Sequence, residues 1–110
     1  MMNFQHKKLA GGKWQKLSFI EQMANIGSEV ERAIKWSKKN CEYSRQAFER
    51  VLELLDLTIS DKNNLSRLKE LVRLREILVD YFQFNNIYQS TDQKWQNYFY
   101  AFNYAARLGK

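Results

Sequence analysis

The chain has 110 residues, of which 45% are hydrophobic and 27% are charged, and it contains no proline. This length suits one domain with one hydrophobic core, and a chain without proline favours long helices. The sequence has no run of 18 apolar residues and no secretory signal pattern, so we expect no membrane partner and, with a single cysteine at Cys41, a cytoplasmic location.

The net charge of +6 is unevenly spread along the chain. Residues 1–39 hold eight Lys or Arg against three Glu, whereas residues 40–110 hold ten Lys or Arg against nine acidic residues. Residues 1–17 show no helical period, and we interpret them as a flexible basic arm of which Trp14 and Leu17 dock on the body. A basic arm attracts phosphate groups. Its candidate phosphate-contacting residues are Lys7, Lys8, Lys13, Trp14 and Lys16; the alternative is that these lysines only favour solubility.

Four amphipathic segments follow, in which apolar residues recur every three or four positions. Short polar connections separate them, as is typical of antiparallel neighbours. The sequence therefore predicts an all-α fold, an antiparallel four-helix bundle that forms a single domain over residues 18–110. The helices are expected at about 18–36, 42–59, 65–82 and 91–108.

Three helix starts carry capping signals. Ser18 and Glu21 have the spacing of a capping box, in which each side chain accepts a hydrogen bond from the other residue's backbone amide. Asn64 is a candidate cap for the third helix. Ser90 with Gln93 resembles a second capping box before the fourth helix.

Gly27 lies inside the first predicted helix, where glycine costs about 1 kcal/mol relative to alanine. A helix keeps such a residue where another backbone comes close. We therefore predict a tight crossing at Gly27, with either a partner chain or the small residues of the fourth helix, which are Ala101, Ala105 and Ala106.

The fourth segment carries six aromatic residues between positions 95 and 104. Most of them fall on one helical face and are expected in the core: Trp95, Tyr98, Phe99 and Phe102. Tyr100, Tyr104 and Arg107 form a separate line with the spacing i, i+4, i+7. This line is either ordinary surface or a patch that meets another subunit or a partner.

Arg75 falls in the middle of the apolar arc of the third helix. A buried guanidinium needs a carboxylate or backbone carbonyls around it, and the candidate partners are Glu29 and Asp56. Arg75 and its partner then form either a structural ion pair that fixes the register of the bundle or an anion site between helices. A rotated helix would instead leave Arg75 exposed.

The third helix also has apolar residues on more than one face. Leu74, Ile77 and Tyr81 are the candidates for a surface through which the protein binds another copy of itself.

The sequence offers little for catalysis. It has no Cys/His cluster, no Glu-x-x-His pair and no glycine-rich phosphate loop, so we expect no metal and no cofactor. The only histidine, His6, lies in the arm, which leaves no plausible acid–base set for an enzyme.

Four strings of the sequence resemble those of an uncharacterised family of small bacterial all-helical proteins. The resemblance covers roughly residues 14–108 and implies no activity. The strings are "IEQMANIGSEVERAIKW", "AFERVLELLDLTI", "RLREILVDYF" and "WQNYFYAFNYAAR".

At the level of the fold, a short four-helix chain is similar to HEPN domains, which occur beside small nucleotidyltransferases and in RNA-cleaving toxins. Their ribonuclease members carry an arginine followed, after four to six residues, by a histidine. No histidine follows an arginine at that spacing here. The resemblance therefore implies at most a non-catalytic partner.

Two functional hypotheses follow. The preferred one is a non-enzymatic bundle that acts through protein–protein contact, as a homodimer or with another protein. The alternative is a nucleic-acid-associated module, or a HEPN-like partner in a nucleotidyltransferase or toxin–antitoxin type system. In the nucleic-acid form, the basic arm contacts phosphates while Trp14 or Tyr104 stacks on bases.

Overall fold

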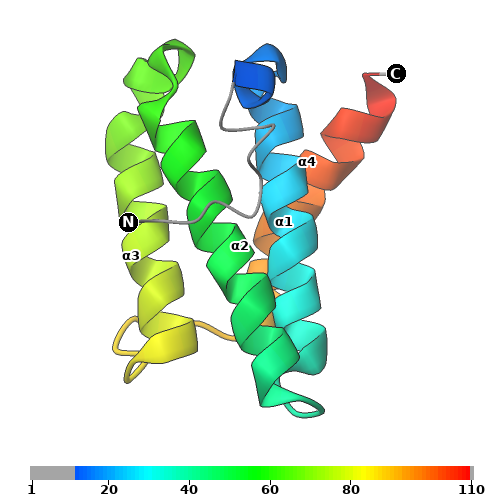
Figure 1. Cartoon of the computed structure of the whole chain (residues 1–110), viewed down its shortest axis with the longest axis vertical. Coiled ribbons are helices and arrows are strands. Elements are labelled where there is room, and N and C mark those ends of the chain that lie inside the picture. The colour runs from blue at the N-terminus through cyan, green and yellow to red at the C-terminus, as the bar shows by residue number, and fades with distance from the viewer. Residues whose placement is uncertain (1–11, 110) are drawn as a thin grey trace.

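The computed structural model describes residues 12–109, which form an antiparallel bundle of four α-helices (Figure 1). This confirms the fold class predicted from the sequence. Two 3-10 turns, η2 (Trp14–Lys16) and η3 (Lys62–Arg67), lie at the end of the bundle that is uppermost in Figure 1. The four helices are α1 (Phe19–Trp36), α2 (Cys41–Ser60), α3 (Leu68–Gln83) and α4 (Asp92–Leu108).

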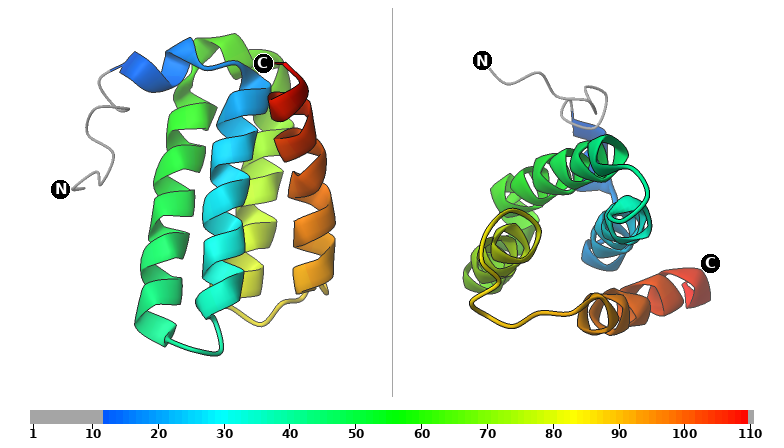
Figure 2. Two further views of the ribbon diagram at one scale, coloured as in Figure 1. Left: turned by 90° about the vertical axis from the view of Figure 1, so that its right-hand side faces the viewer. Right: turned by 90° about the horizontal axis from the view of Figure 1, so that it is seen from below.

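Successive helices run in opposite directions, and α1 packs against both α2 and α4 (Figure 2). The third helix, α3, packs mainly on α2 and forms one side of the molecule (Figures 1 and 2). Helix α4 lies close to α1 in its first half and diverges from it toward its C-terminus (Figure 1). One face of α3 and the second half of α4 are therefore the least covered parts of the bundle.

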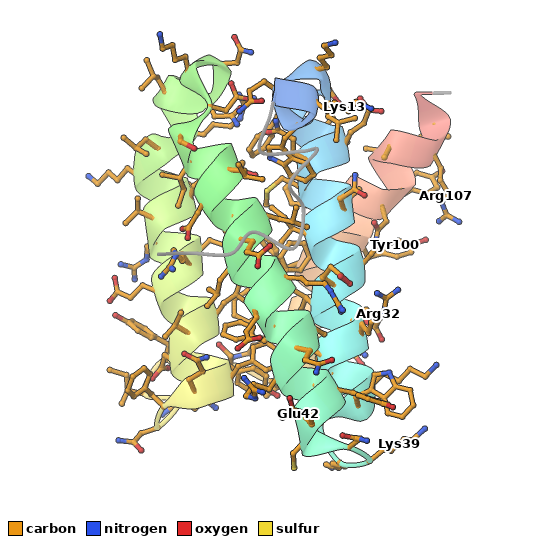
Figure 3. The ribbon with its side chains drawn as sticks, viewed as in Figure 1. Lys13, Arg32, Lys39, Glu42, Tyr100 and Arg107 are labelled. Atoms are coloured by element: carbon orange, nitrogen blue, oxygen red, sulfur yellow. The ribbon has the colours of Figure 1, made fainter. Side chains whose placement is uncertain are left out.

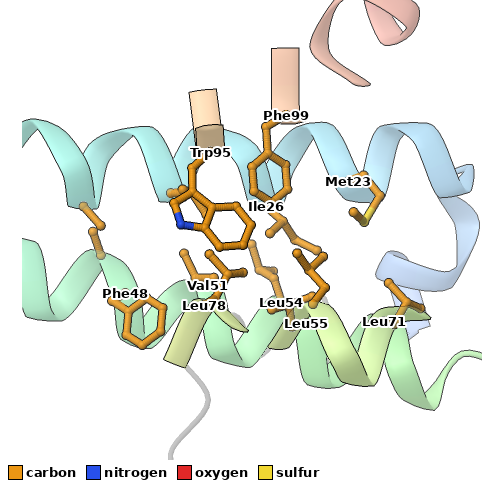
Figure 4. Packing of buried hydrophobic residues seen from close by; sticks show 14 of the residues in the cluster. Met23, Ile26, Phe48, Val51, Leu54, Leu55, Leu71, Leu78, Trp95 and Phe99 are labelled. Atoms are coloured by element: carbon orange, nitrogen blue, oxygen red, sulfur yellow. The ribbon is translucent and has the colours of Figure 1, made fainter. Parts of the chain in front are cut away.

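All four helices contribute to the hydrophobic core, which Figure 4 shows at close range. Trp95 and Phe99, predicted to point inward, are 6% and 3% exposed and lie above Ile26 and Leu54 (Figure 4). Phe102 is only half-buried at the margin of the core, where its ring meets Phe19 edge-on at 6.1 Å. The aromatic run of α4 thus mainly fills the core.

The capping box predicted at the start of α1 is present. The Glu21 amide donates to Ser18 Oγ at 3.1 Å, and the Ser18 amide donates to Glu21 Oε1 at 3.0 Å. The second capping box is wrong: Thr91 caps α4 by accepting from the Lys94 amide. The Ser90 amide instead donates to the side chain of Asn86, because the preceding loop turns back on itself at this point.

Helix α3 begins three residues later than predicted. Residues 62–67 form η3, which Asp61 caps by accepting from the Asn63 amide at 3.0 Å. Asn64, predicted as a helix cap, is buried in this turn and is used for contacts with other elements.

The close approach predicted at Gly27 is confirmed, and it is made with the fourth helix, but the contacting residue is Phe99. A Cβ atom added to Gly27 would lie 2.8 Å from Phe99 Cβ. The alanines expected there do not make this contact, because the three atoms nearest to the added Cβ all belong to Phe99. Phe99 therefore packs directly on the backbone of α1 at Gly27.

Candidate interaction surfaces

Trp14 anchors the N-terminal segment to the body of the bundle. Its side chain is 1% exposed, and its indole Nε1 donates to Thr58 Oγ1 at 2.9 Å. This burial confirms the prediction that Trp14 docks on the body, and it corrects the alternative in which Trp14 stacks on bases. Lys13 and Lys16 are exposed on this segment. Lys7 and Lys8 lie outside the described residues.

A buried polar network, which periodicity did not reveal, holds this end of the bundle together. Gln22 donates to the Trp14 carbonyl and to Asp61 Oδ2, both at 2.9 Å. Asn64 donates to Gln22 Oε1 at 2.9 Å and to the Thr58 carbonyl at 3.0 Å. These hydrogen bonds are internal, so the network fixes the positions of η2 and η3.

Arg75 forms the inter-helix ion pair with one of its two predicted partners. Its Nε donates to Asp56 Oδ1 at 2.9 Å, which links α3 to α2. The pair is not buried, because the side chains are 37% and 36% exposed. Glu29, the other predicted partner, instead accepts from Arg32 at 2.8 Å within α1. The pair therefore sits at the surface, where it contributes about 1 kcal/mol or less.

Tyr100, Tyr104 and Arg107 do lie on an exposed face of α4. The two tyrosines are 60% and 50% exposed, and their rings stack with centroids 6.2 Å apart. Figure 3 shows Tyr100 and Arg107 projecting from the same side of α4. They border an open groove of about 490 Å³ between α1 and α4, whose α1 wall includes Asn25 and Ser28.

The three residues predicted as a binding surface on α3 are not a free surface. Leu74 is 6% exposed and belongs to the core. Ile77 is half-buried against the same core, and Tyr81 is half-buried with its hydroxyl donating to Asp92 at the start of α4. These residues face inward and toward α4, so the predicted surface is wrong.

The exposed apolar surface of α3 lies on a different side, which we call the α3 outer face. Leu68 and Val72 are 38% and 48% exposed. Val79 continues the line; it is half-buried against the core and also helps to line a shallow hollow of about 440 Å³. The most exposed members lie beyond the two ends of α3. They are Leu65 at 67%, Phe84 at 70% and Ile87 at 73% exposure.

Asp80 holds the loop that carries Phe84 and Ile87. Its side chain is buried, and its two carboxylate oxygens accept from the amides of Ile87 and Tyr88, each at 3.1 Å. Its carbonyl accepts from the amide of Phe84 at 3.1 Å. The apolar side chains of this loop are therefore presented on an ordered backbone.

Charged residues border the α3 outer face. The Tyr88 hydroxyl donates to Glu76 Oε1 at 2.6 Å, and this bond with the negative charge of Glu76 raises the pKa of Tyr88. The guanidinium of Arg73 lies over the Tyr88 ring, 5.9 Å from its centroid. Arg75 lies in the middle of the face. Charged groups thus lie both beside the apolar residues and among them.

The described residues show neither a metal-binding cluster nor a helix able to cross a bilayer. Residues 12–109 bring no three His, Cys, Asp or Glu side chains together in a geometry suited to a metal ion. None of the helices in this range is both long and apolar enough for a membrane span.

Comparison of the chain with protein-family models, curated proteins and solved structures gives no match. The resemblances to a small bacterial family and to HEPN domains therefore stay predictions.

Proposed function

We propose that this protein is a non-enzymatic helical bundle that acts through protein–protein contact and associates with a second copy of itself. The observation that carries the proposal is the α3 outer face, where six apolar residues are well exposed or line an open hollow. Isolated exposed apolar residues are ordinary, but several that gather on one side of a helix favour a binding surface; Val72, Val79, Phe84 and Ile87 line one hollow. The exposed free thiol of Cys41 suits the reducing cytoplasm as the place of action.

The shape of the α3 outer face is better suited to binding a protein than to binding a small molecule. Its hollow is open, and its lining combines four apolar side chains and Tyr88 with the charged residues Arg75, Glu76 and Asp80. Small-molecule sites are usually concave and enclose most of the ligand. A broad apolar strip with a charged border instead resembles the core and rim of a protein interface.

Light scattering across a concentration series tests this proposal. We expect the average mass to rise from about one chain at low micromolar concentration toward two chains as the concentration increases. Because apolar contact drives the association, moderate salt should weaken it only slightly. A single-chain mass throughout the high micromolar range would contradict the proposal.

The second candidate function is binding of single-stranded nucleic acid on the Tyr100 side of α4. The stacked pair of exposed tyrosines beside Arg107 favours it, because bases stack on aromatic rings while a guanidinium contacts phosphate. Trp14 does not contribute, since it is buried. The HEPN-like partner role rests on the four-helix architecture alone.

Fluorescence anisotropy with a short single-stranded RNA tests the second candidate. Binding that falls steeply with salt and is weakened by Tyr104→Ala supports it. Leu108→Ala, another exposed apolar position at the end of α4, is the matched control. Absence of binding at low salt would end this candidate.

A further inference from the structure

The open groove between α1 and α4 is lined by two rows of polar side chains. Residues three, four or seven positions apart share one face of a helix, and the spacing within each row follows this rule. The rows consist of Asn25 and Ser28 on α1 and of Tyr100, Asn103 and Arg107 on α4. The groove therefore combines an aromatic ring, two carboxamides, a hydroxyl and a guanidinium.

The course of α4 and two small residues keep this groove hollow. Helix α4 diverges from α1 toward its C-terminus, which separates the two rows (Figure 1). Ala24 and Ala106 line the space between the helices with short side chains. The resulting volume of about 490 Å³ lies in the range of sites that bind small molecules. Because the groove is open, a ligand group inside it can belong to a longer chain.

The polar groups of the groove have hydrogen-bonding capacity that the fold does not use. Asn103 is half-buried, and its carboxamide forms no hydrogen bond within residues 12–109. Asn25 donates through Nδ2 to the Glu21 carbonyl at 2.8 Å, which leaves its Oδ1 as an acceptor. Arg107 is exposed and forms no ion pair with the described residues. The groove thus offers one complete carboxamide, one further acceptor and one cation.

We propose that the α1–α4 groove binds an adenine nucleotide of a single-stranded nucleic acid. This inference rests on the second candidate function, because it names the nucleotide and the groups that recognise it. The adenine ring stacks on Tyr100, which is 60% exposed beside the groove. Asn103 forms hydrogen bonds with the edge of the base, and Arg107 contacts a phosphate.

The hydrogen-bonding groups favour adenine over the other bases. A carboxamide has a donor and an acceptor side by side, which match N7 and the N6 amino group of adenine. The Oδ1 atom of Asn25 accepts the second hydrogen of the same amino group. On the same edge guanine presents only acceptors, and uracil has no amino group. Cytosine has one, but its single ring offers Tyr100 less area for stacking.

The spacing of the residues on α4 fits one nucleotide. Tyr100 and Arg107 project from the same side of the helix (Figure 3), and seven residues of α-helix rise about 10 Å. A nucleotide spans such a separation between its base and its phosphate. Tyr104 stacks on Tyr100 and is 50% exposed, so it extends the aromatic surface to a neighbouring base. The net charge of +6 also favours a polyanion over a neutral ligand.

Fluorescence anisotropy with six-nucleotide RNAs of a single base type tests the proposal. We expect oligo(A) to bind at least about fivefold more tightly than oligo(C) or oligo(U), the factor that one well-placed carboxamide contributes. Asn103→Ala should abolish this preference while circular dichroism shows an intact fold. Asn97→Ala is the matched control, because Asn97 is exposed on the same helix and does not line the groove.

The phosphate contact is tested by the salt dependence of oligo(A) binding. Loss of one phosphate contact lowers the slope of log K against log salt by about 0.7 for a single strand. We expect this change in Arg107→Gln, with the preference for adenine retained. An unchanged slope would overturn the role given to Arg107.

Adenosine monophosphate, titrated by calorimetry, separates the failure of this inference from the failure of the second candidate function. RNA that binds equally well whatever its base, and is weakened by Tyr104→Ala but not by Asn103→Ala, would overturn the groove and leave the second candidate standing. Binding of the monophosphate without binding of any RNA would overturn the nucleic acid as the source of the nucleotide. Absence of binding by both ligands would overturn both proposals.

Discussion

Thr58 shows how one residue can hold two elements together. Its hydroxyl accepts from Trp14 Nε1 and donates to the Leu54 carbonyl. Thr58→Val keeps the shape but leaves the buried indole N–H without an acceptor, so we expect a loss of about 1–3 kcal/mol in the free energy of unfolding. Urea denaturation measures this loss. Thr58→Ser retains the hydroxyl and should cost less, so equal losses in the two variants would contradict the role given to this hydrogen bond.

Gly27 is the residue at which sterics outweigh helix propensity. Alanine in a helix is favoured over glycine by about 1 kcal/mol, but the added Cβ would lie 2.8 Å from Phe99 Cβ and force α4 away from α1. We expect Gly27→Ala to lower the melting temperature. Gly109→Ala is the matched control, because a Cβ atom added to Gly109 would lie 3.7 Å from the nearest atom, the Ala105 carbonyl oxygen. The φ of Gly109 is −75°, which alanine adopts without strain. A Gly27→Ala protein as stable as the wild type would contradict the tight crossing.

Tyr81 makes the free energy of unfolding depend on pH in the alkaline range. Burial, together with the hydrogen bond to Asp92 and its negative charge, raises the pKa of Tyr81 from 10 to about 12. The fold therefore favours the neutral phenol, and this stabilisation is complete below pH 10 and lost as the pH rises from 10 to 12. Burial also raises the pKa of Tyr98, in the same direction.

Denaturation at a series of alkaline pH values checks this prediction. The free energy of unfolding of the wild type should fall between pH 10 and pH 12, and that of Tyr81→Phe should fall less because one titrating group is absent. An identical decline in both proteins would show that Tyr81 does not contribute.

Among the elements, the loop between α3 and α4 depends most on a single side chain. Asp80→Ala would leave the amides of Ile87 and Tyr88 without their acceptor, so we expect faster hydrogen exchange at both positions. Self-association should weaken as well, because Phe84 and Ile87 would no longer be held in place. Asp80→Asn keeps one acceptor oxygen and should have an intermediate effect. Unchanged exchange in Asp80→Ala would refute this role of the loop.

The helices could be predicted from the sequence because their signals are local. The apolar period and the capping box of Ser18 and Glu21 act over three or four residues, and the observed ends of α1 and α2 lie within one residue of the predictions. Asn64 was misjudged because its hydrogen bonds reach Gln22, which is 42 residues away. No periodic pattern contains such a contact.

The candidate site was harder to predict than the helices. Apolar residues cover about half the circumference of α3, so the helical wheel alone does not show which of them the neighbouring helices cover. Leu74 was predicted to belong to a binding surface, whereas the structure buries it and leaves Val72 48% exposed. Helix α2 carries Asp56, which forms the ion pair with Arg75. The position of α2 therefore determines which side of α3 stays exposed.

At the scale of the whole molecule, the account depends on association through the α3 outer face. Val72 lies near the middle of this face, and because it is 48% exposed in a single chain, its replacement should leave the fold intact. Val72→Glu would place an unpaired carboxylate in the interface of both copies, where burial of a charge is costly. We expect the dissociation constant to rise at least about 100-fold, which corresponds to about 2.7 kcal/mol.

Sedimentation equilibrium of the wild type, Val72→Glu and Leu108→Glu measures this effect most directly, with circular dichroism to confirm that all three are folded. Leu108 is 69% exposed at the end of α4, so Leu108→Glu introduces the same charge away from α3. The account predicts dimers for the wild type and Leu108→Glu and single chains for Val72→Glu. Equal dimerisation of all three folded proteins, or no dimer in any of them, would contradict it.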